Sequence, residues 1–102
     1  MHIYNKLARD KVPTLIKASG KRPHTRILSE QEYIQALHEK LQEKVFLFTA
    51  TDSLEELADI LELVHTLAKT HHITPRELEI LRACKARAEG GFRQRIFLEH
   101  VD

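Results

Sequence analysis

The residues of this chain that could do chemistry are carboxylates at the spacing a divalent cation requires. Glu56 and Asp59 are three residues apart, so on a helix their oxygens can share one ion. Hard cations such as Mg²⁺ prefer oxygen ligands of this kind. A second group of carboxylates would complete such a site, and the candidates near it in the sequence are Glu43, Glu55 and Glu62.

Charge is strongly segregated along the 102 residues, although the net charge is +1. Residues 1–28 carry seven bases against Asp10, whereas residues 29–62 carry nine acids against Lys40 and Lys44. A basic arm beside an acidic middle suits a phosphate ligand held together with a divalent cation. The alternative is that the two segments simply neutralise each other in the fold.

Helix signals dominate the pattern and predict an all-α, antiparallel helical bundle in a single domain, residues 1–102. Residues 11–19 predict a short helix that ends at Gly20. Ser29 with Glu32 forms a capping box for a helix reaching about Ala50. Asp52 or Ser53 can cap the next helix, and Thr74-Pro75 starts one that ends at Gly90-Gly91. Residues 26–28 and 95–98 are strand-like and could pair into a short β ribbon.

A helical wheel of residues 54–68 places Glu56 among apolar positions and Asp59 at their boundary. A carboxylate on an apolar face needs a cation, a metal or a proton, because its unpaired burial costs several kcal/mol. On the preceding helix Lys44 also falls on the apolar face. Its ammonium either reaches solvent along a buried stem or pairs with Glu56 or Asp59.

Four segments then resemble one family in order along the chain. They are IYNKLARDKVPTLIKASGK, TRILSEQEY, EELADILELVHTLAK and KARAEGGFRQRIFLEHV. Together they resemble the small MazG-like, all-α nucleoside triphosphate pyrophosphohydrolases, house-cleaning proteins often labelled phosphoribosyl-ATP pyrophosphohydrolase-like. The resemblance implies cleavage of a nucleoside triphosphate to the monophosphate and pyrophosphate with Mg²⁺. The family motif is Glu-Glu-x-x-Glu on one helix and Glu-x-x-Asp on the next.

The resemblance breaks at the metal ligands. Glu56 and Asp59 keep the second half of the motif, but in the first half only Glu43 matches, and Lys44 and Leu47 stand where two ligands are expected. Near the C-terminus, Glu89 replaces an arginine of the family pattern. The resemblance thus implies a degenerate metal site and a weakly active or inactive homologue. Two alternatives stay open: an active Mg²⁺ enzyme that recruits Glu43, Glu55 or Glu62, and a non-catalytic nucleotide-binding or oligomeric scaffold.

Candidate partners follow from the same residues. Lys6, Arg9 and Lys11 match the family pattern and are the candidate phosphate-binding residues for a nucleotide, with surface salt bridging as their alternative role. The all-round apolar segment 45–48 favours a homo-oligomer, dimer or tetramer. Nucleic acid is disfavoured, because Tyr4 is the one aromatic residue in the basic segment.

The remaining features predict a cytoplasmic protein that does not enter a membrane. No apolar run approaches the roughly 20 residues that span a bilayer, and the N-terminus lacks the apolar stretch of a secretory signal. The single cysteine, Cys84, excludes an internal disulfide, fits a reducing compartment, and is expected as a small core residue.

Overall fold

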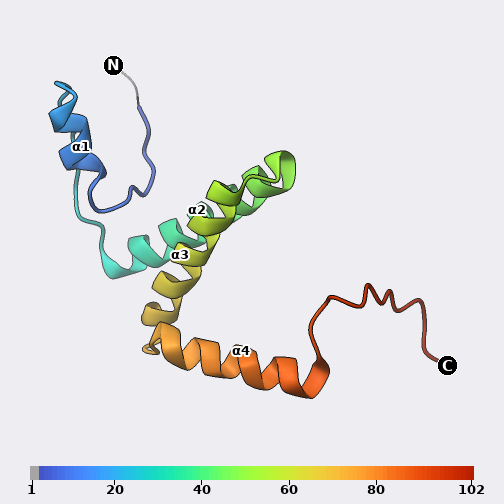
Figure 1. The fold of residues 1–102 in the computed structure, drawn as a ribbon. Helices are drawn as coiled ribbons and strands as arrows, with labels where there is room; N and C mark the ends of the chain where they lie inside the picture. Colours follow the sequence, from blue (N-terminus) through green and yellow to red (C-terminus); the bar gives the residue numbers. More distant parts are fainter. Residues whose placement is uncertain (1–2) are drawn as a thin grey trace.

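The computed structural model describes residues 3–102, which form four helices with irregular segments between and beyond them, and this part of the chain contains no strand. The helices are α1 (Val12–Ala18), α2 (Glu30–Thr51), α3 (Leu54–Thr70) and α4 (Pro75–Glu89). Helices α2 and α3 form an antiparallel pair, and α4 leaves the end of α3 at a steep angle (Figure 1). The all-α class expected from the sequence is confirmed.

Local sequence explains where each long helix begins. The Ser29 hydroxyl accepts from the Glu32 amide and the Glu32 carboxylate accepts from the Ser29 amide, which completes the capping box. The Thr74 hydroxyl accepts from the Glu77 amide at 3.0 Å at the start of α4. The start of α3 differs from the expectation, since Ser53 occupies the capping position without a side-chain hydrogen bond.

The link between α2 and α3 is tight because Asp52 adopts a left-handed conformation, with φ of 54°. An aspartate tolerates this conformation better than most residues, and its amide donates to the Phe48 carbonyl at 2.7 Å. The chain therefore reverses at once, and α3 runs back along α2. This reversal brings residues at equal distances from the link to the same level of the pair.

The helices pack loosely against one another, although a chain of 102 residues is long enough to form a hydrophobic core. Only Leu37 and Ala68 are buried among the hydrophobic side chains of residues 3–102. The radius of gyration is 17.9 Å, whereas a compact chain of this length is expected to have about 13 Å. Within the described residues α2 packs against α3 and α3 against α4, but α1 packs against no other helix. Cys84 is exposed, not in a core.

The β ribbon expected from residues 26–28 and 95–98 does not form. Residues 26–28 belong to the extended link that leads into α2, and residues 95–98 follow α4, which carries the chain away from that link (Figure 1). The Arg95 amide instead donates to the Phe92 carbonyl within a local turn. Strand pairing needs two adjacent backbones, and the direction of α4 keeps these segments apart.

Candidate functional site

The candidate site lies between α2 and α3, close to the link that joins them. Lys44 of α2 and Asp59 of α3 are each about two helical turns from that link, so the antiparallel pair places them at the same level. The Lys44 Nζ lies 3.1 Å from Glu56 Oε2 and 3.1 Å from Asp59 Oδ2. Lys44 therefore pairs with both carboxylates, which is one of the two arrangements that its place on the apolar face allows.

A second cation reaches the site from the N-terminal segment. The Arg9 guanidinium donates to Asp59 Oδ1 at 2.5 Å, so each oxygen of Asp59 faces a different cation. Two positive groups, Lys44 and Arg9, thus balance the two carboxylates Glu56 and Asp59. The cluster is neutral as a whole, and we refer to these four residues as the ion-pair cluster.

The three inner side chains of the ion-pair cluster are shielded from solvent to similar degrees. The exposed fractions are 17% for Lys44, 22% for Glu56 and 27% for Asp59, whereas Arg9 is 59% exposed. Glu56 Oε2 is buried and has no hydrogen bond of good geometry, although the Lys44 ammonium lies 3.1 Å away. The charge of Lys44 is therefore the main compensation for the burial of this oxygen.

The pKa values of the cluster shift in the directions that these contacts require. The hydrogen bond from Arg9, followed by that from Lys44, lowers the pKa of Asp59 below its usual 3.8. The hydrogen bond to Asp59 raises the pKa of Lys44 above 10.5, although burial acts in the opposite direction. The hydrogen bond to Asp59 also raises the pKa of Arg9. All three groups are consequently held in their charged forms around neutral pH.

The residues present do not fit a divalent cation. The Lys44 ammonium occupies the position between Glu56 and Asp59 that a shared ion would need, and its charge would repel that ion. No cluster of three or more His, Cys, Asp or Glu side chains suited to a metal occurs among residues 3–102. The two carboxylates of the site are neutralised by Lys44 and Arg9, and the site lacks the set of oxygen ligands that Mg²⁺ prefers.

The three substitute carboxylates considered from the sequence do not join Glu56 and Asp59. Glu43 lies 3.4 Å from Lys6 and 3.9 Å from Lys40, so it is already paired with lysines. Glu55 and Glu62 are exposed. On a helical wheel of α3 both lie beside Asp59, four and three residues from it, but among residues 3–102 they form no cluster of metal ligands with Glu56 and Asp59.

The candidate phosphate-binding residues separate into paired and peripheral ones. Lys6 pairs with Glu43 and Arg9 with Asp59, while Lys11 is exposed at the residue that precedes α1. Arg26 pairs with Glu32 at 3.2 Å. Three ion pairs therefore join the basic segment 1–28 to the acidic segment 29–62, which is the mutual neutralisation that the charge pattern left open.

The sequence did not predict that Arg9 belongs to the ion-pair cluster. Arg9 and Asp59 are 50 positions apart, and no periodicity links a residue in an irregular segment to a position on a distant helix. The opposite charges of the two segments were the one available signal. Glu89, the other departure from the family pattern, is exposed at the end of α4, 3.9 Å from Lys85.

Comparisons with known proteins give one partial relative. A protein of Mycolicibacterium smegmatis described as uncharacterized is 49% identical to this chain over 47 residues, which are 46% of the chain and 48% of the relative. The chain thus matches about half of the relative's length. No protein-family model and no solved structure matches the chain. Among the described residues, no helix has both the length and the apolar character needed to cross a bilayer.

Proposed function

We propose that this chain is a homologue of the MazG-like nucleoside triphosphate pyrophosphohydrolases whose internal cations have taken the place of the divalent metal. The family reaction, hydrolysis of a nucleoside triphosphate to the monophosphate and pyrophosphate, is then slow or absent. The observation that supports this proposal is the position of the Lys44 ammonium, 3.1 Å from both Glu56 and Asp59.

The physical argument is one of charge. Phosphoryl transfer depends on cations that neutralise the charge developing on the phosphate oxygens, and a metal does this while it also orients the nucleophile. Lys44 and Arg9 supply positive charge, but both are paired with the carboxylates that would otherwise bind the metal. Neither group generates the activated water that a metal provides at neutral pH.

The sharpest test restores the missing ligands. In the double variant Lys44→Glu/Leu47→Glu the ammonium is gone and four carboxylates face one another, so the variant is expected to unfold more easily in the absence of metal. Mg²⁺ or Mn²⁺ should then raise its melting temperature in a concentration-dependent way, because a ligand that binds only the folded state stabilises it. The wild type should show no such shift.

A matched control keeps the same types of substitution away from the site. Lys17→Glu/Leu15→Glu exchanges one lysine and one leucine for glutamates on α1, where both side chains are exposed and the helix has no carboxylate of its own. This variant should not respond to Mg²⁺ or Mn²⁺. If the site variant also fails to respond, ligand loss is not what separates this chain from metal binding, and the proposal fails.

Activity is measured directly as pyrophosphate release from a panel of deoxynucleoside and ribonucleoside triphosphates with Mg²⁺ or Mn²⁺. Background rates are expected for the wild type. Robust turnover by the wild type would refute the degenerate site and favour the active enzyme that recruits Glu43, Glu55 or Glu62.

A second candidate function is metal-free nucleotide binding without catalysis. The exposure of Lys6 and Arg9 in the N-terminal segment supports this function. Both cations are more than half exposed, so a phosphate could displace the carboxylates that they now contact. Calorimetric titration of wild type with nucleoside triphosphates in the presence of a chelator separates this function from a bare scaffold. Binding that is lost in Arg9→Ala would support it, and absence of heat would leave the scaffold.

A further inference from the structure

The basic segment 1–28 holds more positive charge than the acidic segment neutralises. Seven bases stand against one acid in this segment. Three of the bases, Lys6, Arg9 and Arg26, are paired with carboxylates of α2 and α3. Within residues 3–102 the other four are exposed and form no ion pair; they are Lys11, Lys17, Lys21 and Arg22. These four positive charges are therefore available to an anionic partner.

Three of these four bases lie together at the C-terminal end of α1. The helix ends at Gly20, whose φ of 89° suits a glycine and turns the chain back on itself. The Lys21 amide donates to the Ile16 carbonyl at 3.3 Å, and the Gly20 amide donates to the Lys17 carbonyl at 3.0 Å. These bonds hold residues 21 and 22 close to the last turn of α1, which carries Lys17. We call Lys17, Lys21 and Arg22 the α1 basic cluster.

Helix α1 keeps this cluster apart from the acids of the chain. Within the described residues α1 packs against no other helix, and Figure 1 shows it set apart from the α2–α3 pair. The helix itself contains no carboxylate. In the sequence the nearest acids on either side are Asp10, before α1, and Glu30, at the start of α2. The positive potential of the α1 basic cluster is therefore only weakly offset by its surroundings.

We propose that the α1 basic cluster binds the phosphate backbone of a double-stranded nucleic acid without reading its sequence. A duplex carries one negative charge per about 1.7 Å of its axis, and lysine and arginine side chains that neutralise its phosphates release condensed counterions. Arg22 can contact a phosphate through two N–H groups, whereas Lys17 and Lys21 act as point charges. Contacts of this kind position a protein on a duplex but carry no sequence information. The cluster shares no residue with the ion-pair cluster, so this proposal does not rest on the function proposed above.

A duplex fits the α1 basic cluster better than a single strand or a lipid surface does. Single strands are held by aromatic side chains that stack on the bases, and Tyr4 is the one aromatic residue of segment 1–28. The low aromatic content that disfavours nucleic acid in the sequence thus applies to single strands. A lipid surface needs a long apolar face, whereas α1 has seven residues. Of its large apolar side chains Leu15 is 64% exposed, but Val12 and Ile16 are half-buried.

The test is the salt dependence of binding to a labelled duplex DNA, measured by fluorescence anisotropy. Wild type should bind at low salt, and the logarithm of its affinity should fall linearly with the logarithm of the salt concentration. Lys21→Ala/Arg22→Ala should make this slope shallower by about 1.8, because two phosphate contacts are lost. Lys85→Ala/Arg87→Ala is the matched control: it removes one exposed lysine and one exposed arginine from α4 and should keep the wild-type slope. Absence of binding by wild type, an unchanged slope in the cluster variant, or an equal change in the control would overturn the proposal.

A charge-conserving exchange and other anionic probes test the nature of the contact. Lys21→Arg/Arg22→Lys keeps both charges and should keep the wild-type slope, and loss of binding in this variant would overturn a contact made by charge alone. Duplexes of unrelated sequence should bind alike, and so should duplex DNA and duplex RNA of equal length. Single-stranded DNA, and vesicles of phosphatidylcholine with phosphatidylserine, should bind more weakly at the same phosphate concentration. Tighter binding to either probe, or a strong preference for one duplex sequence, would overturn the assignment of a duplex backbone as the partner.

Discussion

The two ends of the α2–α3 pair are built on different principles. Far from the link, about four helical turns away, Leu37 and Ala68 are 2% and 5% exposed. Near the link the corresponding level holds Lys44 with Glu56 and Asp59, which keep about a fifth of their surface in solvent. The end far from the link excludes water with apolar side chains, whereas the end near the link holds oppositely charged side chains that are only partly exposed to solvent.

This difference separates the end that supplies stability from the end that carries the candidate site. Apolar burial is favourable without any partner, whereas each buried charge depends on its neighbour. An ion pair in such a place is weak evidence for stability, since apolar residues of similar size often replace it without loss. We therefore expect substitutions at the two ends to behave differently, and the following experiments test this from the largest effect to the smallest.

Leu37→Ala should cause the largest loss. Removing most of a buried leucine side chain leaves a cavity and should lower the free energy of unfolding by about 2–5 kcal/mol. Urea unfolding followed by circular dichroism at fixed protein concentration measures it. Ile27→Ala is the control, because Ile27 is almost fully exposed and its truncation should change stability by less than about 0.5 kcal/mol. Equal effects of the two variants would contradict the assignment of the apolar end.

Lys44→Met should lower the free energy of unfolding by a smaller amount, about 2 kcal/mol, because Glu56 is left with a buried oxygen and no cation. The triple variant Lys44→Met/Glu56→Leu/Asp59→Leu removes every inner charge and should recover most of this loss. Lys85→Met, which removes an exposed lysine from α4, is the control and should have almost no effect. A triple variant less stable than Lys44→Met would show that the ion pairs are a net source of stability.

The pH dependence should report Asp59. Its pKa is lower in the folded chain than in the unfolded one, so its contribution is fully present above pH 3.8 and is lost as the pH falls through the folded value. Lys44 stays charged throughout this range, because its pKa is raised above 10.5. Wild type should therefore keep its stability advantage over Asp59→Asn from neutral pH down to about pH 4 and lose it progressively as the pH falls further. An advantage that persists unchanged at the acid end would exclude Asp59 as the titrating group.

The helices and one inner contact of the site were predictable from the sequence, and the reasons are local. The capping signals at Ser29 and Thr74 act over three residues. The contact between Lys44 and Glu56 was predictable because each charge falls on the apolar face of its helix. These signals need only the helical period.

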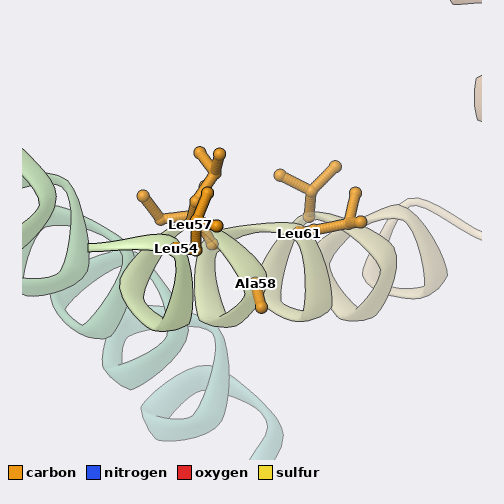
Figure 2. A pocket seen from close by; sticks show the side chains of 6 residues that line it. Leu54, Leu57, Ala58 and Leu61 are labelled. Carbon is orange, nitrogen blue, oxygen red and sulfur yellow. The ribbon is translucent and has the colours of Figure 1, made fainter. Parts of the chain in front are cut away.

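What the sequence did not predict depends on contacts between distant segments. The pairing of Arg9 with Asp59 follows from the path of an irregular segment. The exposure of Leu54, Leu57 and Leu61 on α3 (Figure 2) follows from the direction in which α4 leaves that helix. The apolar periodicity of α3 is the same whether α4, a second copy or solvent meets that side. The sequence therefore showed that one side of α3 is apolar, but it did not show which part of that side the other helices of the chain cover.

The smallest effect is expected from the outermost member of the ion-pair cluster. Arg9→Ala removes the contact that holds the N-terminal segment to α3, but the guanidinium is 59% exposed, so the loss in unfolding free energy should be about 0.5–1 kcal/mol and should shrink with added salt. Hydrogen exchange should rise at the start of α1, where the Val12 amide donates to the Arg9 carbonyl at 3.0 Å, while α2 and α3 stay protected, because Lys44 still pairs with Asp59. Lys11→Ala, an exposed cation of the same segment, serves as the control and should leave that exchange unchanged. Faster exchange throughout α3 in Arg9→Ala would mean instead that Arg9 supports the inner pair itself, and that the charged end of α2–α3 depends on the N-terminal segment as well as on Lys44.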